Sequence, residues 1–293
     1  MNRERKSLLY YCNHVSLVVL SLLCLIPVLI VIAASLSTEN RLVSEGFALW
    51  PRGLTLEAYT FAFQQADTML RAYGVTVFIT LFGTFTSLLI SSLFAYAISR
   101  RDFAYRNSFS FIIFFTMLFN GGLVPTYIVM TNVLHLKDTL WALIVPLLVS
   151  AWNILIMRTF FSQNPQAIIE AAKIEGAGEY RLFFQIIIPM STPVLATIGI
   201  ITVLGYWNDW FNALLYIDNR SLLPLQYLVY NMVANAQMMK ELSNSAGASL
   251  VTAIPTKSLQ MAVVMIVITP MTVIYLYFKR YFVRGLTIGA LKG

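Results

Sequence analysis

The chain has 293 residues, of which 58% are hydrophobic and only 11% are charged, and its mean hydropathy is +0.74. A soluble domain of this length needs more polar side chains to cover its surface, so the composition excludes an ordinary soluble protein. The net charge of +7 comes from Lys and Arg residues that stand singly or in short clusters beside long apolar segments, which argues against nucleic-acid binding. The bilayer is therefore the expected solvent for most of the chain.

Six apolar segments are long enough to cross a hydrocarbon core of roughly 30 Å, which takes about 20 helical residues. In chain order they lie near residues 15–36, 72–99, 109–130, 139–157, 186–208 and 258–278. The first follows a basic N-terminus as a secretory signal would, but it is longer than the usual signal core. The sequence thus predicts an all-α integral membrane protein with about six transmembrane helices in a single domain over residues 1–293.

The basic residues predict the orientation of these spans. If the N-terminus is cytoplasmic and the spans alternate, thirteen of the twenty Lys and Arg residues fall inside. These residues are Arg3, Arg5, Lys6, Arg100, Arg101, Arg106, Arg158, Lys173, Arg181, Lys279, Arg280, Arg284 and Lys292. Because cytoplasmic segments are enriched in Lys and Arg, this orientation is favoured over its inverse, and both termini are predicted to be cytoplasmic.

The inner loop over residues 158–185 contains a predicted short helix. Asn164 can cap a helix start and Pro165 is tolerated at the first helical position. Residues 166–175 favour a helix, and Gly176 is expected to end it, because glycine can take a positive φ that a larger residue would resist.

The chain is then expected to turn back toward the membrane. Gly178 is a second stop signal, and another helix should begin near Glu179 and be interrupted at Pro189. The pattern predicts a short helix, a glycine elbow and a return helix on the cytoplasmic face. Such a helix can dock in a groove of another protein or rest on lipid headgroups, and its periodicity favours neither.

The spacing of this loop resembles a known signature. Glu170-Ala171-Ala172, three residues, Gly176, nine residues and Ile186-Ile187-Ile188-Pro189 resemble the cytoplasmic motif of ATP-binding-cassette (ABC) importer permeases of type I architecture. The only departure is Ile188, where the family has Leu. Asn120 to Pro125, Trp207-Asn208-Asp209 and the ending from Arg284 to Gly293 further resemble the carbohydrate-importing branch, in particular the smaller maltose permease subunit and the permeases for complex saccharides, alginate among them.

The resemblance implies a set of partners and contacts. The partners are a second permease subunit, two copies of a separate ATPase subunit that carries ATP and Mg²⁺, an extracytoplasmic solute-binding protein and a saccharide substrate, all at a bacterial inner membrane. The implied ATPase-coupling residues are Glu170, Ala171, Ala172, Gly176 and Gly178. The C-terminal tail adds candidate ATPase contacts at Gly289, Lys292 and Gly293. The outer loop over residues 209–257 would touch the binding protein through Leu242, Ser243, Asn244, Ser245 and Gly247.

Polar residues at or near membrane depth are candidates for a solute pathway, because such groups tend to face a bundle interior or a water-filled route. They are Asn120, Asn153, Tyr206, Asn208 and Asp209. Interhelical hydrogen bonds, helix caps and, for Tyr206, an interfacial aromatic belt are the alternative explanations.

Two other functional classes fit the sequence less well. An ion-coupled secondary transporter predicts carboxylates within the spans and two similar halves, and the chain has neither. A non-transporting membrane scaffold gives no reason for the glycine elbow. No Lys follows a Gly, so the chain has no phosphate-binding loop of its own, and we expect no catalytic residue, no metal site and no bound cofactor.

Overall fold

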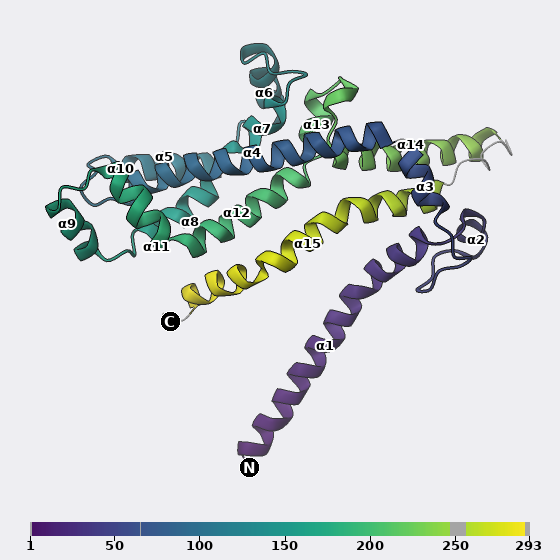
Figure 1. The fold of residues 1–293 in the computed structure, drawn as a ribbon, viewed down its shortest axis with the longest axis horizontal. Coiled ribbons are helices and arrows are strands. Elements are labelled where there is room, and N and C mark those ends of the chain that lie inside the picture. The colour runs from purple at the N-terminus through teal and green to yellow at the C-terminus, as the bar shows by residue number, and fades with distance from the viewer. Residues whose placement is uncertain (1, 65, 247–255, 291–293) are drawn as a thin grey trace. The chain divides into compact units, whose positions relative to one another are not determined.

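The computed structural model describes the backbone of residues 2–64, 66–246 and 256–290, and this part of the chain is helical with no strand (Figure 1). An isolated bridge joins Ser37 and Leu54. The α-helices are α1 (Asn2–Ser35), α2 (Glu39–Glu45), α3 (Glu57–Gln64), α4 (Ala66–Ser99), α5 (Arg106–Leu118), α6 (Leu123–Ile128), α7 (Trp141–Leu148), α8 (Ala151–Phe161), α9 (Gln166–Ile174), α10 (Glu179–Arg181), α11 (Ile188–Met190), α12 (Thr192–Trp207), α13 (Phe211–Tyr216), α14 (Leu225–Ala246) and α15 (Thr256–Ala290). Two π-helices, η1 (Val129–Val133) and η2 (Leu182–Ile187), and the 3₁₀ turn η3 (Arg220–Leu222) complete the set.

Three of the described helices are individually long and apolar enough to cross a membrane, over Tyr10–Ser35, Asp67–Ser99 and Lys257–Ile274. Each lies over one of the six predicted spans. Three bent helix pairs pass the same test together, which raises the number of spans to as many as six. The predicted all-α membrane architecture is confirmed.

The three remaining spans are broken rather than continuous. The segment predicted at 109–130 bends by 112° between α5 and α6. At this bend Gly122 has a φ of +89°, and its backbone N–H donates to Asn120 Oδ1 at 2.9 Å. The segment predicted at 139–157 bends by 47° between α7 and α8. The segment predicted at 186–208 bends by 82° at Ser191, between Pro189 and Pro193, because neither proline can donate a helical hydrogen bond.

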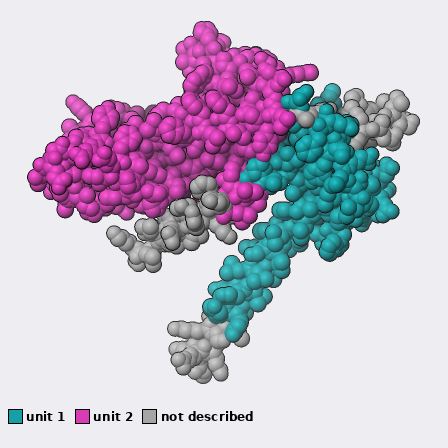
Figure 2. All heavy atoms as spheres, in the orientation of Figure 1, with its two compact units in different colours: residues 1–69, 229–270 teal, residues 70–228, 271–293 magenta. Residues whose placement is uncertain are grey.

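The described chain divides into two compact units (Figure 2), residues 1–69 with 229–270, and residues 70–228 with 271–293. In the first unit the Glu39 carboxylate caps the beginning of α15. It accepts hydrogen bonds from the backbone N–H groups of Lys257 at 3.0 Å and Ser258 at 2.8 Å. A carboxylate is favoured there because the N-terminus of a helix carries partial positive charge.

The second unit contains two apolar clusters. One surrounds Ile79, Leu143 and Tyr216, and the other surrounds Ile98, Met157 and Phe183, all of which are at most 1% exposed. The second cluster also includes Ile169 of α9, so this short helix is attached to the membrane-spanning part of its unit.

A close contact between α4 and α12 gives a stability prediction. A Cβ atom added at Gly83 would lie 2.5 Å from Cζ of Tyr206. That ring cannot move away easily, since it is 1% exposed and its hydroxyl donates to the Ile144 carbonyl at 2.9 Å. We therefore expect Gly83→Ala to destabilise the protein by about 1–3 kcal/mol, as overpacking does. Thermal unfolding of the purified protein in detergent measures this.

Gly74 provides the matched control in the same helix. A Cβ atom there meets no atom within 4 Å, so Gly74→Ala should leave the melting temperature unchanged or raise it through better helix propensity. Equal melting temperatures for the two variants would show that α4 and α12 are not in close contact at Gly83.

Candidate functional site

The glycine elbow after α9 is built as a Schellman motif. Gly176 has a φ of +81°, its N–H donates to the Lys173 carbonyl at 3.0 Å, and the N–H of Ala177 donates to the Ala172 carbonyl at 2.9 Å. These are the two bonds that satisfy the last carbonyl groups of a helix when the next residue is left-handed. The prediction that Gly176 ends the helix with a positive φ is confirmed.

Gly178 has a different role from the expected one. Its φ of −72° and ψ of 166° are ordinary for any residue, and it stands immediately before α10, which begins at Glu179 as predicted. A Schellman motif needs one left-handed residue, so the second glycine is not part of the helix stop.

α9 packs against the core of its unit through one narrow face. Ile169 is 6% exposed and Ala172, one turn later, packs against the same cluster. The other apolar side chains of the helix remain uncovered, since Ile168 is 41% and Ile174 is 87% exposed, and Ala171 is exposed as well. Glu170 is also on the exposed surface. An apolar helix face left open beside a carboxylate is typical of a surface that docks into a partner.

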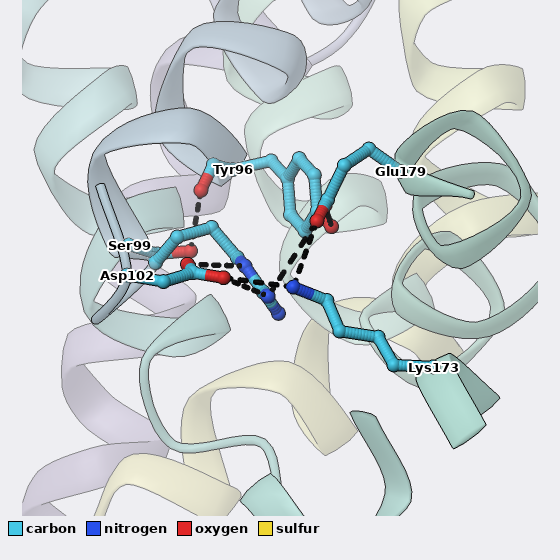
Figure 3. Close-up of polar contacts among 6 residues, drawn as sticks. Tyr96, Ser99, Asp102, Lys173 and Glu179 are labelled. Atoms are coloured by element: carbon cyan, nitrogen blue, oxygen red, sulfur yellow. Dashed lines mark hydrogen bonds and ion pairs between the residues drawn. The ribbon is translucent and has the colours of Figure 1, made fainter. Parts of the chain in front are cut away.

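A cluster of charges fixes α9 to the end of α4 (Figure 3). Lys173 Nζ lies 2.8 Å from Asp102 Oδ2 and 3.1 Å from Glu179 Oε1. Arg100 reaches the same Asp102 carboxylate with both Nε, at 3.2 Å, and Nη2, at 2.8 Å. Tyr96 of α4 donates its hydroxyl to Glu179 Oε2 at 2.5 Å. We call these five residues the α9 clamp, because they join the α4 end, α9 and the beginning of α10.

The clamp shifts the protonation of its acids. Hydrogen bonds from Lys173 and then from Arg100 lower the pKa of the Asp102 carboxyl from 3.8 to about 2. Burial acts to raise the pKa of the Glu179 carboxyl, but hydrogen bonds from Tyr96 and Lys173 outweigh it and the pKa lies below its ordinary value. The same hydrogen bonds to Asp102 and Glu179 raise the pKa of Lys173. All three groups therefore stay charged at neutral pH.

Removing the Asp102 charge should loosen the clamp. Asp102→Asn leaves Arg100, which is only 9% exposed, without its bidentate acceptor, and we expect a loss of about 1–2 kcal/mol. The expected loss is small because the Asp102 side chain is 53% exposed and solvent screens its charge. Thermal unfolding of wild-type and variant protein measures the difference.

The pH dependence follows from the lowered pKa of Asp102. A carboxyl whose folded pKa is depressed stabilises the fold above its unfolded pKa, near 3.8, and loses that contribution as the pH falls through about 2. The difference between wild type and Asp102→Asn should thus be constant from about pH 5 to pH 8. A difference that disappears at about pH 6 would mean that the Asp102 contact does not persist in solution.

The candidate pathway residues come from several elements. Asn120 lies in the connection between α5 and α6 and Asn153 is buried within α8. Tyr206 is a core residue whose burial and hydrogen bond to Ile144 explain it without a solute. Asn208 is exposed, and its side chain bonds to the Leu204 carbonyl at 2.9 Å and to Gln226 at 3.1 Å.

Asp209 has a structural partner at the beginning of α13. Its carboxylate accepts the backbone N–H of Asn212 at 3.1 Å and the side-chain amide of the same residue at 2.8 Å. Burial raises the pKa of the Asp209 carboxyl, although the hydrogen bonds from Asn212 act in the opposite direction. The interpretation of Asp209 as a helix cap therefore explains the observed contacts.

The remaining predicted contacts lie at the edges of the described chain. Gly289 is near the end of α15, whereas Lys292 and Gly293 are outside the described residues. α14 continues to Ala246, but the side chains of Leu242, Ser243, Asn244 and Ser245, and Gly247 as a whole, are outside them too.

Sequence reasoning missed the α9 clamp. It assigned Arg100 and Lys173 only to topology and Glu179 only to a helix start. The pairs Tyr96–Glu179 and Asp102–Lys173 join residues 83 and 71 positions apart, and no sequence spacing predicts which loops meet. A weak signal was available, since Arg100 and Asp102 occupy a very short turn between two predicted spans.

Comparisons with known proteins agree with this architecture. Residues 87–288 match the family described as binding-protein-dependent transport system inner membrane component. The polygalacturonan/rhamnogalacturonan transport system permease protein YtcP of Bacillus subtilis (strain 168) is 36% identical over 278 residues, which cover 94% of this chain and 96% of the relative. The arabinooligosaccharides transport system permease protein AraQ of Halalkalibacterium halodurans is 27% identical over 100% of both chains.

A solved structure shares the fold. It is the crystal structure of a bacterial ABC transporter involved in the import of the acidic polysaccharide alginate. One of its chains matches with a TM-score of 0.82 and 26% sequence identity, covering 94% of this chain and 97% of that chain.

Proposed function

The chain belongs to the family of binding-protein-dependent transport system inner membrane components, and from this membership we propose that it is the permease subunit of an ATP-driven importer of oligosaccharides or polysaccharides. The relatives named above transport polygalacturonan, rhamnogalacturonan, arabinooligosaccharides and alginate, which supports a saccharide as the substrate. The observation that supports the coupling role is that Ile169 and the α9 clamp hold α9 in place while Ile168, Ala171 and Ile174 stay exposed.

The exposed face of α9 is the proposed contact with the ATPase. The proposed coupling residues are Glu170, Ala171 and Ala172 within α9, Gly176 where the helix ends, and Gly178 immediately before α10. ATP and Mg²⁺ would be bound by that separate subunit, and this chain would hold no cofactor. Gly289, Lys292 and Gly293 are a second proposed ATPase contact, at the C-terminal tail.

The proposed mechanism is alternating access. A binding protein docks on the outer side, where residues Leu242 to Gly247 would contact it. ATP closes the two ATPase subunits, and α9 carries that movement through the α9 clamp into α4. A path shared with a second permease subunit then opens outward and takes the saccharide. Its proposed lining in this chain is Asn120, Asn153, Asn208 and Asp209, with Tyr206 holding the end of α12 in place.

Reconstitution tests this function. The chain and the permease and ATPase subunits that purify with it are placed in liposomes with internal ATP and external binding protein. We expect saccharide uptake that requires both. Uptake driven by an ion gradient without ATP would instead identify a secondary transporter, and a stable protein that binds no ATPase would favour a scaffold.

The orientation of the chain gives a separate prediction. The thirteen inner basic residues place both termini in the cytoplasm, and the contact of Lys173 with Asp102 requires that the α4–α5 turn and α9 lie on the same side. Reporter enzymes fused after Arg106 and after Arg181 should thus be cytoplasmic, and fusions within 56–67 or 242–253 should be external. Alkaline phosphatase activity of each fusion measures this, and an active fusion after Arg181 would overturn the orientation.

A further inference from the structure

A basic cavity of ≈ 460 Å³ lies beside the α9 clamp, within the second unit. It opens between the end of α4, the beginning of α5, the end of α8 and the beginning of α9. Four of its lining residues are Arg100, Arg101, Arg106 and Arg158, and none of the described lining residues is acidic. Arg100 is paired with Asp102, whereas Arg101, Arg106 and Arg158 have no ion pair among the described residues, so these three arginines give the cavity its net positive charge.

Two buried donors of this cavity lack acceptors. Arg100 is 9% exposed, and while its Nε and Nη2 bond to Asp102, its Nη1 has no partner among the described residues. The side-chain Nδ2 of Asn164, which also lines the cavity, has no partner there either. Buried polar groups are nearly always hydrogen-bonded, so two unpaired donors on residues that line one cavity favour an acceptor there.

Two helix N-termini border the same cavity. α5 begins at Arg106 and α9 at Gln166, and both residues line it. Neither helix has a side-chain hydrogen bond at its N-cap. The partial positive charge of a helix N-terminus favours an anion, and it adds to the charge of the arginines that line the cavity.

We propose that this cavity binds a phosphate group, supplied by the headgroup of an acidic membrane phospholipid. Guanidinium groups and helix N-termini are the usual ligands of phosphate oxygens, which accept several hydrogen bonds at once. The membrane-spanning part of α4 ends at Ser99 and α5 begins at Arg106, so the cavity lies where lipid headgroups are expected. Tyr105, directly before Arg106, is 66% exposed and Phe109, about one turn after it, is 40% exposed, so both can contact lipid.

Native mass spectrometry of the intact transporter complex tests this proposal. The complex is purified in detergent and titrated with phosphatidylglycerol, with phosphatidylcholine or with inorganic phosphate. We expect one phosphatidylglycerol per copy of this chain to bind more tightly than phosphatidylcholine, with little competition from inorganic phosphate. If inorganic phosphate binds as well as the lipid does, the site is confirmed as a phosphate site and the lipid source is wrong.

Charge variants locate the binding. Because Arg100 belongs to the α9 clamp and its loss can unfold the site, the test uses the double variant Arg106→Gln with Arg158→Gln. We expect its phosphatidylglycerol affinity to fall by about tenfold or more, because each arginine near an acidic headgroup strengthens lipid binding by a similar amount and two are removed. Arg181→Gln is the matched control, because Arg181 bonds to Gln185 outside the cavity, and it should bind lipid as wild type does.

Three results would overturn the proposal. The first is equal binding of phosphatidylglycerol and phosphatidylcholine with no binding of inorganic phosphate. The second is unchanged affinity in the double variant. The third is loss of the ATPase subunit from the double variant without any change in lipid binding, which would show that a protein carboxylate occupies the cavity. The readout is lipid binding and complex composition, so it does not depend on whether the substrate is a saccharide.

Discussion

Replacing Glu170 with lysine is expected to reduce ATP-dependent uptake by more than about tenfold, because a reversed charge adds repulsion to the loss of an ion pair. Glu170 is exposed on α9 and is not part of the α9 clamp, so it is available to a basic residue of the ATPase. The variant should still insert in the membrane and pair with the second permease, since it lies outside every span. Uptake and ATPase activity in proteoliposomes measure the effect.

Two further variants separate charge from shape at this position. Glu170→Ala should lower uptake less than Glu170→Lys, because it removes the pair without adding repulsion. Glu170→Gln keeps the size of the side chain and should resemble Glu170→Ala if the charge is what matters. The ratio of subunits on a gel shows whether the ATPase has been lost or is bound but uncoupled. If Glu170→Lys transports at the wild-type rate, α9 is only a surface anchor and does not couple the ATPase to transport.

Replacing Gly176 with valine should also strongly reduce transport, and for a different physical reason. A Cβ atom at Gly176 meets no atom within 4 Å, so steric contact with other residues does not oppose it. The cost arises in the backbone, because a β-branched residue at a φ of +81° is strained by about 1–3 kcal/mol. The chain can relieve this strain by opening the Schellman motif, which would misdirect the return to α10 and move α9 away from its partner.

The nearby Gly178 is the matched control for that prediction. A Cβ atom added there also meets no atom within 4 Å, but the φ of Gly178 is −72°, so Gly178→Ala should leave stability and transport nearly unchanged. The stability and transport of Gly176→Asn should lie between those of Gly176→Val and Gly178→Ala, because asparagine tolerates the left-handed region better than valine does. Melting temperature and uptake are measured for all three. Equal losses in Gly178→Ala and Gly176→Val would show that left-handed geometry is not the cause.

Under the proposed function, the α9 clamp would let a small helix transmit force. α9 touches the core of its unit mainly through Ile169 and Ala172. Lys173 adds ion pairs to Asp102, directly after α4, and to Glu179, at the beginning of α10. Under the proposed function, a displacement of α9 is therefore shared between α4 and the helix that leads to α12.

The sequence predicted the class of fold and the elbow because both depend on local properties of the chain. Span length and apolar composition are read directly along the chain, and they placed α1, α4 and α15 in the membrane. Gly176 was identified because few residues other than glycine adopt a left-handed conformation at a helix end. The sequence also predicted an interruption at Pro189, but not that α5 and α6 diverge by 112°.

The α9 clamp and the basic cavity, in contrast, depend on which loops meet after folding. Arg100 looks like an ordinary topology signal until the structure places it, 9% exposed, against Asp102 and near Glu179. The cavity likewise collects arginines from the end of α4, the beginning of α5 and the end of α8. Ion pairs between distant loops form only when helix packing sets their separation to a few ångströms, and Coulomb energy falls with that separation. No local pattern encodes that distance, so only the tertiary structure decided these contacts.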